Sequence, residues 1–383
     1  MFGSVIAAAA IAQTKLSFLD QVKPLLTSDQ RKAEQLMRAK FKPEDLTQGI
    51  KPEAEGLNVL FAIDPGEGKH EGVVEGDNLK TVKLNHVGGL LAAVVKLREG
   101  QGTQLRYNVD GKPGKGYNLE VYTPNPFVMG PPGGRKGEMR DMGAWEGDIY
   151  KGTTRKWFIY LPPNIDPSHE YPVLIGTDAQ WDKDWQANAL ENCAREGKIP
   201  PTVGVFIEAG QLKAGDGFKH RADEYDVLND DYSKFLLTEI LPQVEKIVKL
   251  SKDPAKRATT GVSSGGICGF TSCWEHPESF GVLISCVGSF DDIKHGESLK
   301  DGGHNYPFFI RLTPKKPIRV FLQDGTHDLD NDFGNWFLGN AQMAAALKYK
   351  GYDVQWHPGE GFHSSDHIRS IYDKALVWWN GIK

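Results

Sequence analysis

The chain has little cysteine and no long apolar run. Only four of its 383 residues are cysteines, and none of the four lies in a Cys-x-x-Cys pair. Four cysteines in so long a chain are too few for a disulfide scaffold, and the missing pairs argue against a zinc or redox site of that kind. We therefore expect buried free thiols. No run of 18 apolar residues occurs, which excludes a membrane-spanning helix.

Positive charge is also not in excess. The chain carries 45 Lys and Arg against 50 Asp and Glu, a net charge of −5. Without a basic excess, no global field attracts nucleic acid or an anionic membrane, so neither is expected as a partner. Apolar residues at 39% and charged residues at 25% are typical of a folded chain. At roughly 150 residues per domain, the length predicts more than one domain.

The first 12 residues are uncharged and mostly small or apolar. Ala10-Ile11-Ala12 fits the small-x-small pattern of signal-peptidase cleavage, so we expect a signal peptide at 1–12 and a secreted or periplasmic protein. A basic region is missing, and the alternative is an Ala-rich start to the next helix. From 13 to 52 we expect a helical lead-in, interrupted at Pro24 and restarted at the cap-like Thr27-Ser28-Asp29.

Residues 53–123 read as a small β domain. Six short strand-like runs lie between 57 and 122, divided by Gly and Asp. Asp110-Gly111 is a hairpin signal, because both residues readily adopt the positive φ of a tight turn. This spacing predicts a β-sandwich. The next segment, 124–143, is rich in Pro and Gly and is predicted to be a linker without regular structure.

Residues 144–383 alternate between strand-like and helical stretches. We expect strands at 156–161, 173–176, 202–207, 258–262, 281–287, 318–323 and 353–357, and helices at 185–196, 232–250, 339–350 and 370–379. Such alternation predicts right-handed βαβ crossovers and a mostly parallel sheet covered on both faces. The fold class of this part is therefore α/β.

One motif in the α/β part carries chemistry. Gly261-Val262-Ser263-Ser264-Gly265 follows a predicted strand and opens a predicted helix, which is the setting of a nucleophile elbow. We expect the two glycines to permit the sharp turn that holds the Ser263 hydroxyl at the carboxyl end of the sheet. The Ser264 amide, at the helix N-terminus, is then a candidate donor to an oxyanion. The plainer interpretation is an ordinary glycine turn.

A nucleophilic serine needs a base and an acid that orients the base, which follow it in the order Asp, His in α/β-hydrolases. His363 directly follows a glycine turn after the last predicted strand and is the expected base. Asp328 lies just past the preceding strand and is the expected acid. Asp324 abuts that strand and is better placed to cap the turn, while Asp330 remains a further candidate.

A metal site is the weaker interpretation of the histidine segment. His367 lies four residues from His363, so the two could pair on a metal if the segment were helical. Gly359 and Gly361 instead predict a loop, and no third ligand is evident. We therefore expect neither a metal nor a cofactor.

Further candidates lie at the same end of the predicted sheet. The loop after strand 173–176 offers the backbone amide of Ala179 or Gln180 as a second oxyanion donor. Trp181, Tyr225 and Trp336 fall in predicted loops or helix starts and are expected to line an aromatic cleft for the substrate. Each of these rings, taken alone, can equally be packing.

Four more motifs accompany the elbow: Thr153-Thr154-Arg155, Tyr160-Leu161-Pro162-Pro163, Glu224-Tyr225-Asp226 and Leu250-Ser251-Lys252-Asp253-Pro254. With them, the chain resembles the family of α/β-hydrolases named "Putative esterase", which includes enterochelin esterases, esterase D and feruloyl or acetyl-xylan esterases. The resemblance covers roughly 145–383 and is nearest to the enterochelin-esterase-like branch. It implies an α/β-hydrolase fold with Ser263, Asp328 and His363 as the triad, and an immunoglobulin-like domain at 57–122.

Residues and resemblance together predict a serine carboxylic-ester hydrolase. Its expected substrates are feruloyl, acetyl or related esters of small molecules or glycans. One alternative is a siderophore trilactone esterase, and another is a non-catalytic protein that binds a glycan or a partner. We expect the 57–122 domain to cover one side of the cleft and influence substrate choice, against the alternative of a stabilising or tethering module.

Overall fold

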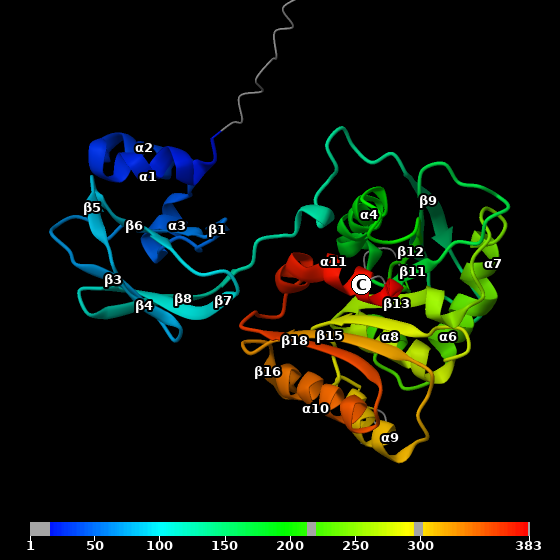
Figure 1. Cartoon of the computed structure of the whole chain (residues 1–383). Coiled ribbons are helices and arrows are strands. Elements are labelled where there is room, and N and C mark those ends of the chain that lie inside the picture. The colour runs from blue at the N-terminus through cyan, green and yellow to red at the C-terminus, as the bar shows by residue number, and fades with distance from the viewer. Residues whose placement is uncertain (1–15, 213–219, 295–301, 382–383) are drawn as a thin grey trace, which may run out of the picture. The chain divides into compact units, whose positions relative to one another are not determined.

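The structure is a computed structural model that describes residues 16–212, 220–294 and 302–381. The expected signal peptide at 1–12 lies outside the described residues. The chain divides into two compact units, Met1–Val121 and Tyr122–Lys383 (Figure 1). Within the described ranges, no helix combines the length and the apolar character needed to cross a membrane.

The N-terminal unit begins with the helices α1 (Phe18–Ser28), α2 (Gln30–Lys40) and α3 (Pro43–Gln48). The expected break at Pro24 is wrong, because Pro24 lies inside α1. The buried Leu19 and Val22 hold this helix in the core, which offsets the hydrogen bond that proline cannot donate. The chain turns instead at Asp29, whose side chain caps α2 by accepting from the Lys32 amide at 3.1 Å.

Two antiparallel sheets follow in the same unit. In order, one contains β1 (Ala54–Glu55), β2 (Asn58–Ile63), β6 (Leu90–Lys96) and β5 (Asn85–Val87), and the other β4 (Leu79–Lys83), β3 (Gly72–Gly76), β7 (Gln101–Val109) and β8 (Lys112–Val121). Val59 and Phe61 pack in the core that the two sheets share, whereas Leu60 packs with the helices. The Asp-Gly hairpin between β7 and β8 is confirmed, with φ of 51° and 75° at its two residues.

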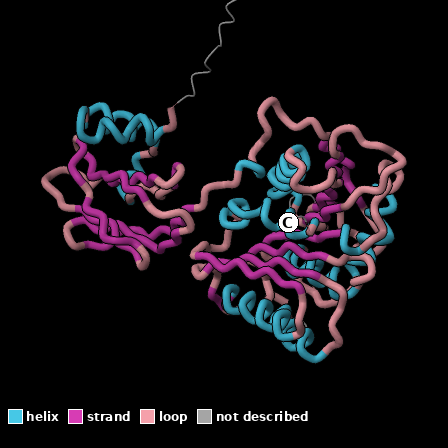
Figure 2. The backbone as a smooth tube through the Cα atoms, in the orientation of Figure 1, coloured by secondary structure: helices cyan, strands magenta, loops and turns pink. Residues whose placement is uncertain are grey.

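The C-terminal unit is built on a mixed, mostly parallel eight-stranded sheet, as the α/β alternation predicts. Figure 2 shows its strands together with the helices of the same unit. Only β9 and β10 run against their neighbours, at one edge. The strand order is β18 (Asp353–Gly359), β15 (Arg319–Gly325), β14 (Val282–Cys286), β13 (Arg257–Val262), β11 (Val173–Gly176), β12 (Val203–Ile207), β10 (Arg155–Leu161) and β9 (Glu138–Trp145).

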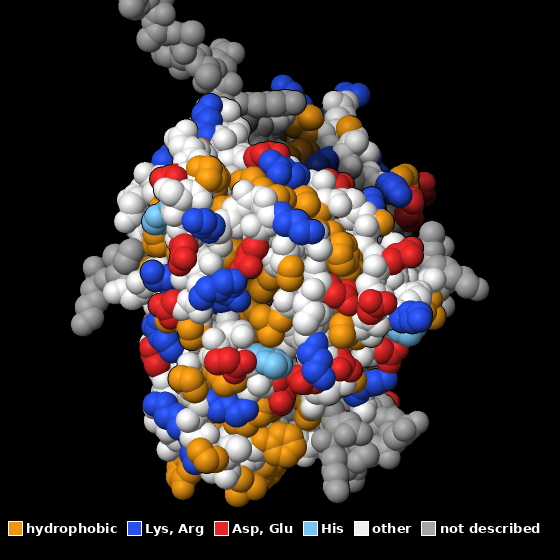
Figure 3. All heavy atoms as spheres, turned by 90° about the vertical axis from the view of Figure 1, so that its right-hand side faces the viewer, with side chains coloured by type: hydrophobic (Ala, Val, Ile, Leu, Met, Phe, Trp, Pro, Cys, Tyr) orange, Lys and Arg blue, Asp and Glu red, His pale blue; other side chains and the backbone are white. Residues whose placement is uncertain are grey.

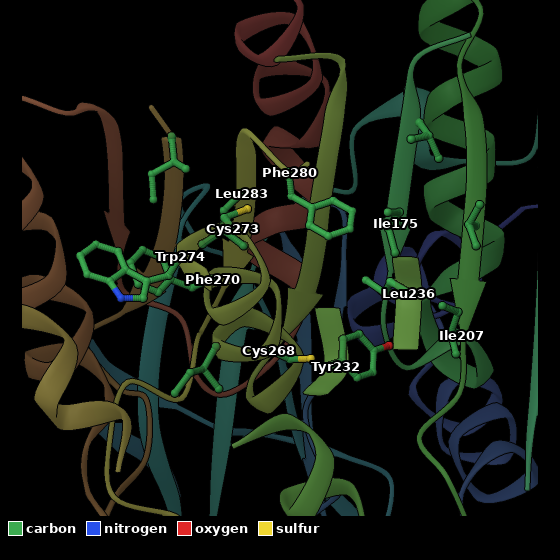
Figure 4. Packing of buried hydrophobic residues seen from close by; sticks show 14 of the residues in the cluster. Ile175, Ile207, Tyr232, Leu236, Cys268, Phe270, Cys273, Trp274, Phe280 and Leu283 are labelled. Carbon is green, nitrogen blue, oxygen red and sulfur yellow. The ribbon is translucent and has the colours of Figure 1, made fainter. Parts of the chain in front are cut away.

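Helices cover both faces of this sheet. One layer contains α4 (Ala179–Arg195) and α11 (Asp366–Asn380). The other contains α5 (Arg221–Tyr225), α6 (Asp231–Phe235), α7 (Leu241–Val244), α8 (Ser264–Glu275), α9 (Tyr306–Leu312) and α10 (Trp336–Tyr349). Leu174 of β11 faces the first layer, and Ile175 the second, where α8 residues such as Phe270 and Cys273 pack (Figure 4).

Two segments differ from the sequence-based expectation. The helix expected at 232–250 is split, because a π-helical turn at Leu236–Ile240 and Pro242 interrupt it. The linker expected at 124–143 is largely ordered and ends inside β9. Asn192 of α4 donates to two of its carbonyl oxygens at 2.7 and 2.9 Å, and Glu191 accepts from two of its amides at the same distances. Composition could not reveal these partners.

The surface and the thiols agree with the composition. On the face in Figure 3, basic and acidic side chains are interspersed. All four cysteines are buried and free, as expected.

Candidate active site

Ser263 lies on a sharp turn between strand and helix. β13 ends at Val262 and α8 begins at Ser264, and Ser263 itself has φ 60° and ψ −125°. A serine in this region of φ/ψ space is strained, so the surrounding contacts must hold it there. Its amide donates to the Cys286 carbonyl oxygen of the neighbouring strand at 2.9 Å, which fixes the turn to the sheet.

The two glycines of the motif permit the sharp turn because they have no Cβ atom, as expected from the sequence. The positive φ belongs to Ser263 and not to Gly261 or Gly265. A Cβ atom on Gly261 would lie 2.4 Å from the backbone of Gly265, and one on Gly265 would lie 2.2 Å from Thr177 Oγ1. The strand and the helix therefore approach each other more closely than any side chain permits.

The structure brings the three expected residues into one chain of hydrogen bonds. Ser263 Oγ lies 2.8 Å from His363 Nε2, and His363 Nδ1 lies 2.6 Å from Asp328 Oδ1. The Asp328 side chain is fully buried. A carboxylate only accepts hydrogen bonds, so Nδ1 carries the imidazole hydrogen and Nε2 is left to accept the hydrogen of the Ser263 hydroxyl.

Asp324 lies behind this chain, at the end of β15. It is fully buried, with one carboxyl oxygen 2.6 Å from the Gly325 amide and the other 2.6 Å from Asn340 Nδ2. The first contact is the turn cap expected from the sequence. Burial, followed by a hydrogen bond to the Asp328 carboxyl, raises the pKa of Asp324 well above its ordinary value. Asp324 caps the turn behind Asp328, while Asp330 is exposed.

The candidate oxyanion donors lie at two helix N-termini. Ser264 is the first residue of α8 and Ala179 the first of α4, so both amides belong to the four that an α-helix leaves without an internal partner. The start of α4 lies beside the elbow, because Thr177 and Asp178 are the nearest atoms to a Cβ built on Gly265. Gln180 is the second residue of α4. Partial positive charge at both helix ends favours an anion there.

An ion pair that the sequence did not predict stabilises the turn at Ser263. Arg221 forms a bidentate pair with the buried Asp178, at 2.8 and 2.7 Å, and its Nη2 also donates to the Val262 carbonyl oxygen at 3.1 Å. This arrangement ties the start of α4 to the end of β13. No spacing or motif in the sequence pairs these residues.

A cavity of about 320 Å³ opens beside Ser263. Five apolar and five polar residues line it: Arg221, Ala222, Asp226, Ser263, Ser264, Ile293, Leu329, Asn331, Phe333 and Trp336. Burial raises the pKa of the Asp226 carboxyl to about 7. A pocket of this size and character accommodates a small aromatic or aliphatic group.

The expected aromatic cleft is only partly correct. Trp336 lines the cavity, and its ring lies edge-on to His363 with centroids 5.8 Å apart. Tyr225 is wholly buried in the core and cannot reach a substrate in this conformation, so that expectation is wrong. Trp181 is 60% exposed on α4 and is not among the residues that line the cavity. Burial depends on neighbouring elements, which the sequence pattern did not specify.

Ser289 is a second residue that sequence reasoning missed. It follows β14, is 1% exposed, and its Oγ lies 3.2 Å from Ser263 Oγ. Trp336 Nε1 lies 3.1 Å from the same Ser289 oxygen. The local signal was weak, since a serine just beyond a buried strand is ordinary in any loop.

His367 has a packing role. Its ring stacks on Tyr122 with centroids 4.4 Å apart, and Gln323 Nε2 donates to its Nδ1 at 2.9 Å. Burial lowers the pKa of His367 to about 4, so the ring is neutral. Across the three described ranges, no group of three or more His, Cys, Asp or Glu side chains is arranged to hold a metal ion.

The family motifs outside the elbow include a buried ion pair. Arg155 and Glu224 form two bonds of 2.7 and 2.8 Å, with both side chains 2% exposed. Arg155 also donates to Thr153 Oγ1, so three of the residues that carry the resemblance meet in one structural cluster. These motifs therefore support the fold.

Comparison with known protein families shows to which family this chain belongs. The family model described as "Putative esterase" matches residues 150–377. The chain belongs to this family. Sequence relatives include the iron(III) enterobactin esterase of Dickeya dadantii, 24% identical over 242 residues, which covers 58% of this chain and 50% of the relative. Its Escherichia coli K12 counterpart is 25% identical over 151 residues, 38% of this chain and 35% of that protein. The match therefore spans at most about half the length of these two relatives.

Solved structures show that this member of the esterase family has the α/β-hydrolase-like fold. The enterobactin esterase from Shigella flexneri, crystallised in the presence of enterobactin, superposes with a TM-score of 0.61 at 16% identity and covers 87% of this chain and 96% of its own. A ferulic acid esterase gives a TM-score of 0.52 at 16% identity and covers 65% of this chain and 99% of its own. The family predicted from the sequence is thus confirmed.

Proposed function

We propose that this protein is a serine carboxylic-ester hydrolase in which Ser263, His363 and Asp328 form the catalytic triad. The observation that carries the proposal is the unbroken chain of hydrogen bonds from Ser263 Oγ through the imidazole to Asp328, at 2.8 and 2.6 Å. The position of Ser263 on a strained turn beside a cavity supports the same conclusion. Membership of the esterase family supports the ester bond as the target.

The proposed reaction uses the chain's own side chains. His363 Nε2 takes the hydroxyl proton while Ser263 Oγ attacks the ester carbonyl carbon. The amides of Ser264 and of Ala179 or Gln180 stabilise the oxyanion. His363 then protonates the departing alcohol, and Asp328 stabilises the imidazolium that forms in between. A water molecule, activated by the same imidazole, hydrolyses the acyl-enzyme.

The substrates we propose are feruloyl, acetyl or related esters of small molecules or glycans. The apolar part of the cavity wall, which includes Leu329, Phe333 and Trp336, suits a planar aromatic acyl group, and a volume of about 320 Å³ suits a group of that size. The polar Arg221 and Asp226 side chains in the same wall suit ring substituents that form hydrogen bonds.

A siderophore trilactone is the second candidate substrate. It is favoured by the likeness to the Shigella flexneri enterobactin esterase, which extends over 87% of the chain and thus beyond the α/β unit. The N-terminal unit, with two four-stranded antiparallel sheets around one core, is then proposed to correspond to an immunoglobulin-like domain. Turnover of methyl ferulate, acetylated xylan and a catecholate trilactone, measured side by side, separates the two candidates. Activity on the trilactone alone would make the siderophore ester the preferred substrate.

The nucleophile is tested by Ser263→Ala. We expect kcat on p-nitrophenyl acetate to fall on the order of 10⁴-fold or more, and labelling by a fluorophosphonate probe to be lost. Ser285→Ala is the matched control, because Ser285 is a buried serine of the adjacent strand. A folded wild-type protein that the probe does not label would favour a non-catalytic binding function. Wild-type turnover by Ser263→Ala would exclude the assignment.

A further inference from the structure

Ser289 belongs to the same hydrogen-bond chain as the proposed nucleophile. Its Oγ lies 3.2 Å from Ser263 Oγ and 3.1 Å from Trp336 Nε1. Its amide donates to the Ser263 carbonyl oxygen at 3.1 Å, which holds the two residues together. Ser289 and Trp336 are 1% and 2% exposed, so packing fixes both side chains.

The donor and the acceptor of each hydrogen bond around Ser263 follow from the chemistry of the groups. An indole N–H can only donate, so Ser289 Oγ accepts from Trp336. The Ser263 hydrogen points to the accepting Nε2 of His363, which leaves a lone pair of Ser263 Oγ facing Ser289. The Ser289 hydroxyl hydrogen is therefore the one that joins the two serines, and Ser289 donates to the nucleophile.

We propose that the Ser289 hydroxyl is a catalytic hydrogen-bond donor to Ser263 Oγ that acts in deacylation; this inference rests on the proposed esterase function. In deacylation a water oxygen bonds to the acyl carbon while His363 takes the water proton. The bond between the acyl carbon and Ser263 Oγ then breaks, Oγ keeps the electron pair, and His363 returns the proton to it. Negative charge grows on Oγ as this bond breaks, directly opposite the Ser289 hydrogen.

The negative charge on Ser263 Oγ develops during deacylation, which explains why the Ser289 hydrogen bond accelerates this step most. In the acyl-enzyme, Ser263 Oγ is an ester oxygen and a poor acceptor, whereas in the transition state for its departure it becomes a strong acceptor. An interaction that is stronger in the transition state than in the ground state accelerates the step. In acylation the ground state is the free Ser263 hydroxyl, which already accepts the Ser289 hydrogen, so this hydrogen bond strengthens less on the way to the transition state and Ser289 contributes little.

The test is Ser289→Ala with p-nitrophenyl acetate under pre-steady-state conditions. We expect kcat to fall by about ten- to a hundredfold and KM to fall in proportion, so that kcat/KM changes by no more than about threefold. The burst of p-nitrophenolate should approach one per active site, and mass spectrometry should find Ser263 carrying an acetyl group. Acetyl-enzyme freed of excess substrate should decay more slowly than wild type by the same factor as kcat.

Two further variants keep the result interpretable. Ser285→Ala removes another buried hydroxyl from the adjoining strand, one with no hydrogen-bond partner among the described residues, and should leave the kinetics unchanged. Ser289→Cys keeps a similar volume and a weaker donor, so its kcat should lie between wild type and Ser289→Ala. Far-UV circular dichroism and thermal unfolding check that each variant is folded.

The outcomes separate this inference from the proposed function. If Ser263→Ala is inactive but Ser289→Ala has wild-type kcat, only the role of Ser289 is refuted. If kcat and kcat/KM fall together in Ser289→Ala without acyl-enzyme accumulation, Ser289 orients the nucleophile for acylation and the deacylation role is wrong. If Ser263→Ala retains activity, both proposals fail.

Discussion

Replacing Asp328 with asparagine tests the geometry around His363 most directly. The Asp328 carboxylate is fully buried and lies 2.6 Å from His363 Nδ1. Asparagine keeps the shape but removes the negative charge that faces the imidazolium formed in the proposed reaction. Its amide nitrogen can also turn toward Nδ1 and favour the tautomer in which Nε2 cannot accept the Ser263 proton.

The size of the effect follows from the charge that is lost. With charge centres roughly 4 Å apart and an effective dielectric constant of about 20, the attraction between carboxylate and imidazolium is about 4 kcal/mol. At about 1.4 kcal/mol per factor of ten, this corresponds to a loss of about a thousandfold in kcat. Misorientation of the imidazole adds to it, so we expect Asp328→Asn to lower kcat by about 10³- to 10⁴-fold.

Asp324→Asn is the matched control. The Asp324 carboxyl accepts from Gly325 and Asn340, whereas Asp328 contacts His363, so an amide of nearly the same shape at position 324 leaves the contact with the imidazole in place. We expect its kcat to remain within about tenfold of wild type. Steady-state kinetics on p-nitrophenyl acetate at pH 7 to 8 measure both variants, and thermal unfolding establishes that each is folded. The reasoning is refuted if Asp328→Asn keeps more than about a tenth of wild-type kcat, or if Asp324→Asn loses as much activity as Asp328→Asn.

Three further predictions concern stability. Glu224→Gln leaves Arg155 buried without its counter-charge and should lower the free energy of unfolding, measured in urea titrations, by about 3 to 5 kcal/mol. The double variant Arg155→Met with Glu224→Leu removes both charges and should recover most of that loss. Equal destabilisation by the single and the double variant would contradict this account. Because burial lowers the pKa of His367 to about 4, the unfolded chain binds more protons between pH 6.5 and 4, and the stability contributed by neutral His367 falls as pH falls through this window. Unfolding free energies should therefore drop more steeply in wild type than in His367→Phe, by up to about 3 kcal/mol, and parallel curves would refute the assignment. Gly265→Ala places a Cβ 2.2 Å from Thr177 Oγ1 and should reduce both Tm and esterase activity, while Gly152→Ala, at a position with open space but positive φ, should reduce Tm alone.

Local patterns predicted the parts of the fold that depend on residues close together in the chain. The α/β alternation indicated a mostly parallel sheet, and the Asp110-Gly111 pair indicated the hairpin between β7 and β8. The elbow was equally local, because a strand, a G-x-S-x-G motif and a helix follow one another within 20 residues or so. In two places, tertiary contacts produced a local structure that differs from the one predicted by local sequence rules. Pro24 lies within α1, and the Pro/Gly-rich segment 124–143 is ordered by side chains of α4.

Much of the candidate site could be anticipated for a similar reason. Chain order and the carboxyl ends of parallel strands suggested Ser263, Asp328 and His363, and the structure brings these three side chains within hydrogen-bond distance. The sequence could not choose the surroundings. Tyr225 was expected in the cleft but is buried, since the helix that carries it packs its ring into the core. The neighbour of the elbow is instead Arg221 from the same helix.

By itself, the amino-acid sequence determined the α/β class, through its periodicity, and the G-x-S-x-G turn with the candidate residues Asp328 and His363 after it, through short motifs and their order. The tertiary structure alone decided that Ser289 lies 3.2 Å from the Ser263 hydroxyl and that Asp324 is fully buried. Ser289 lies beside Ser263 because β13 pairs with β14, and Asp324 is buried because its strand, β15, lies between β14 and β18. Strand pairing brings together residues that are distant in the chain, and no local sequence pattern records which strands pair.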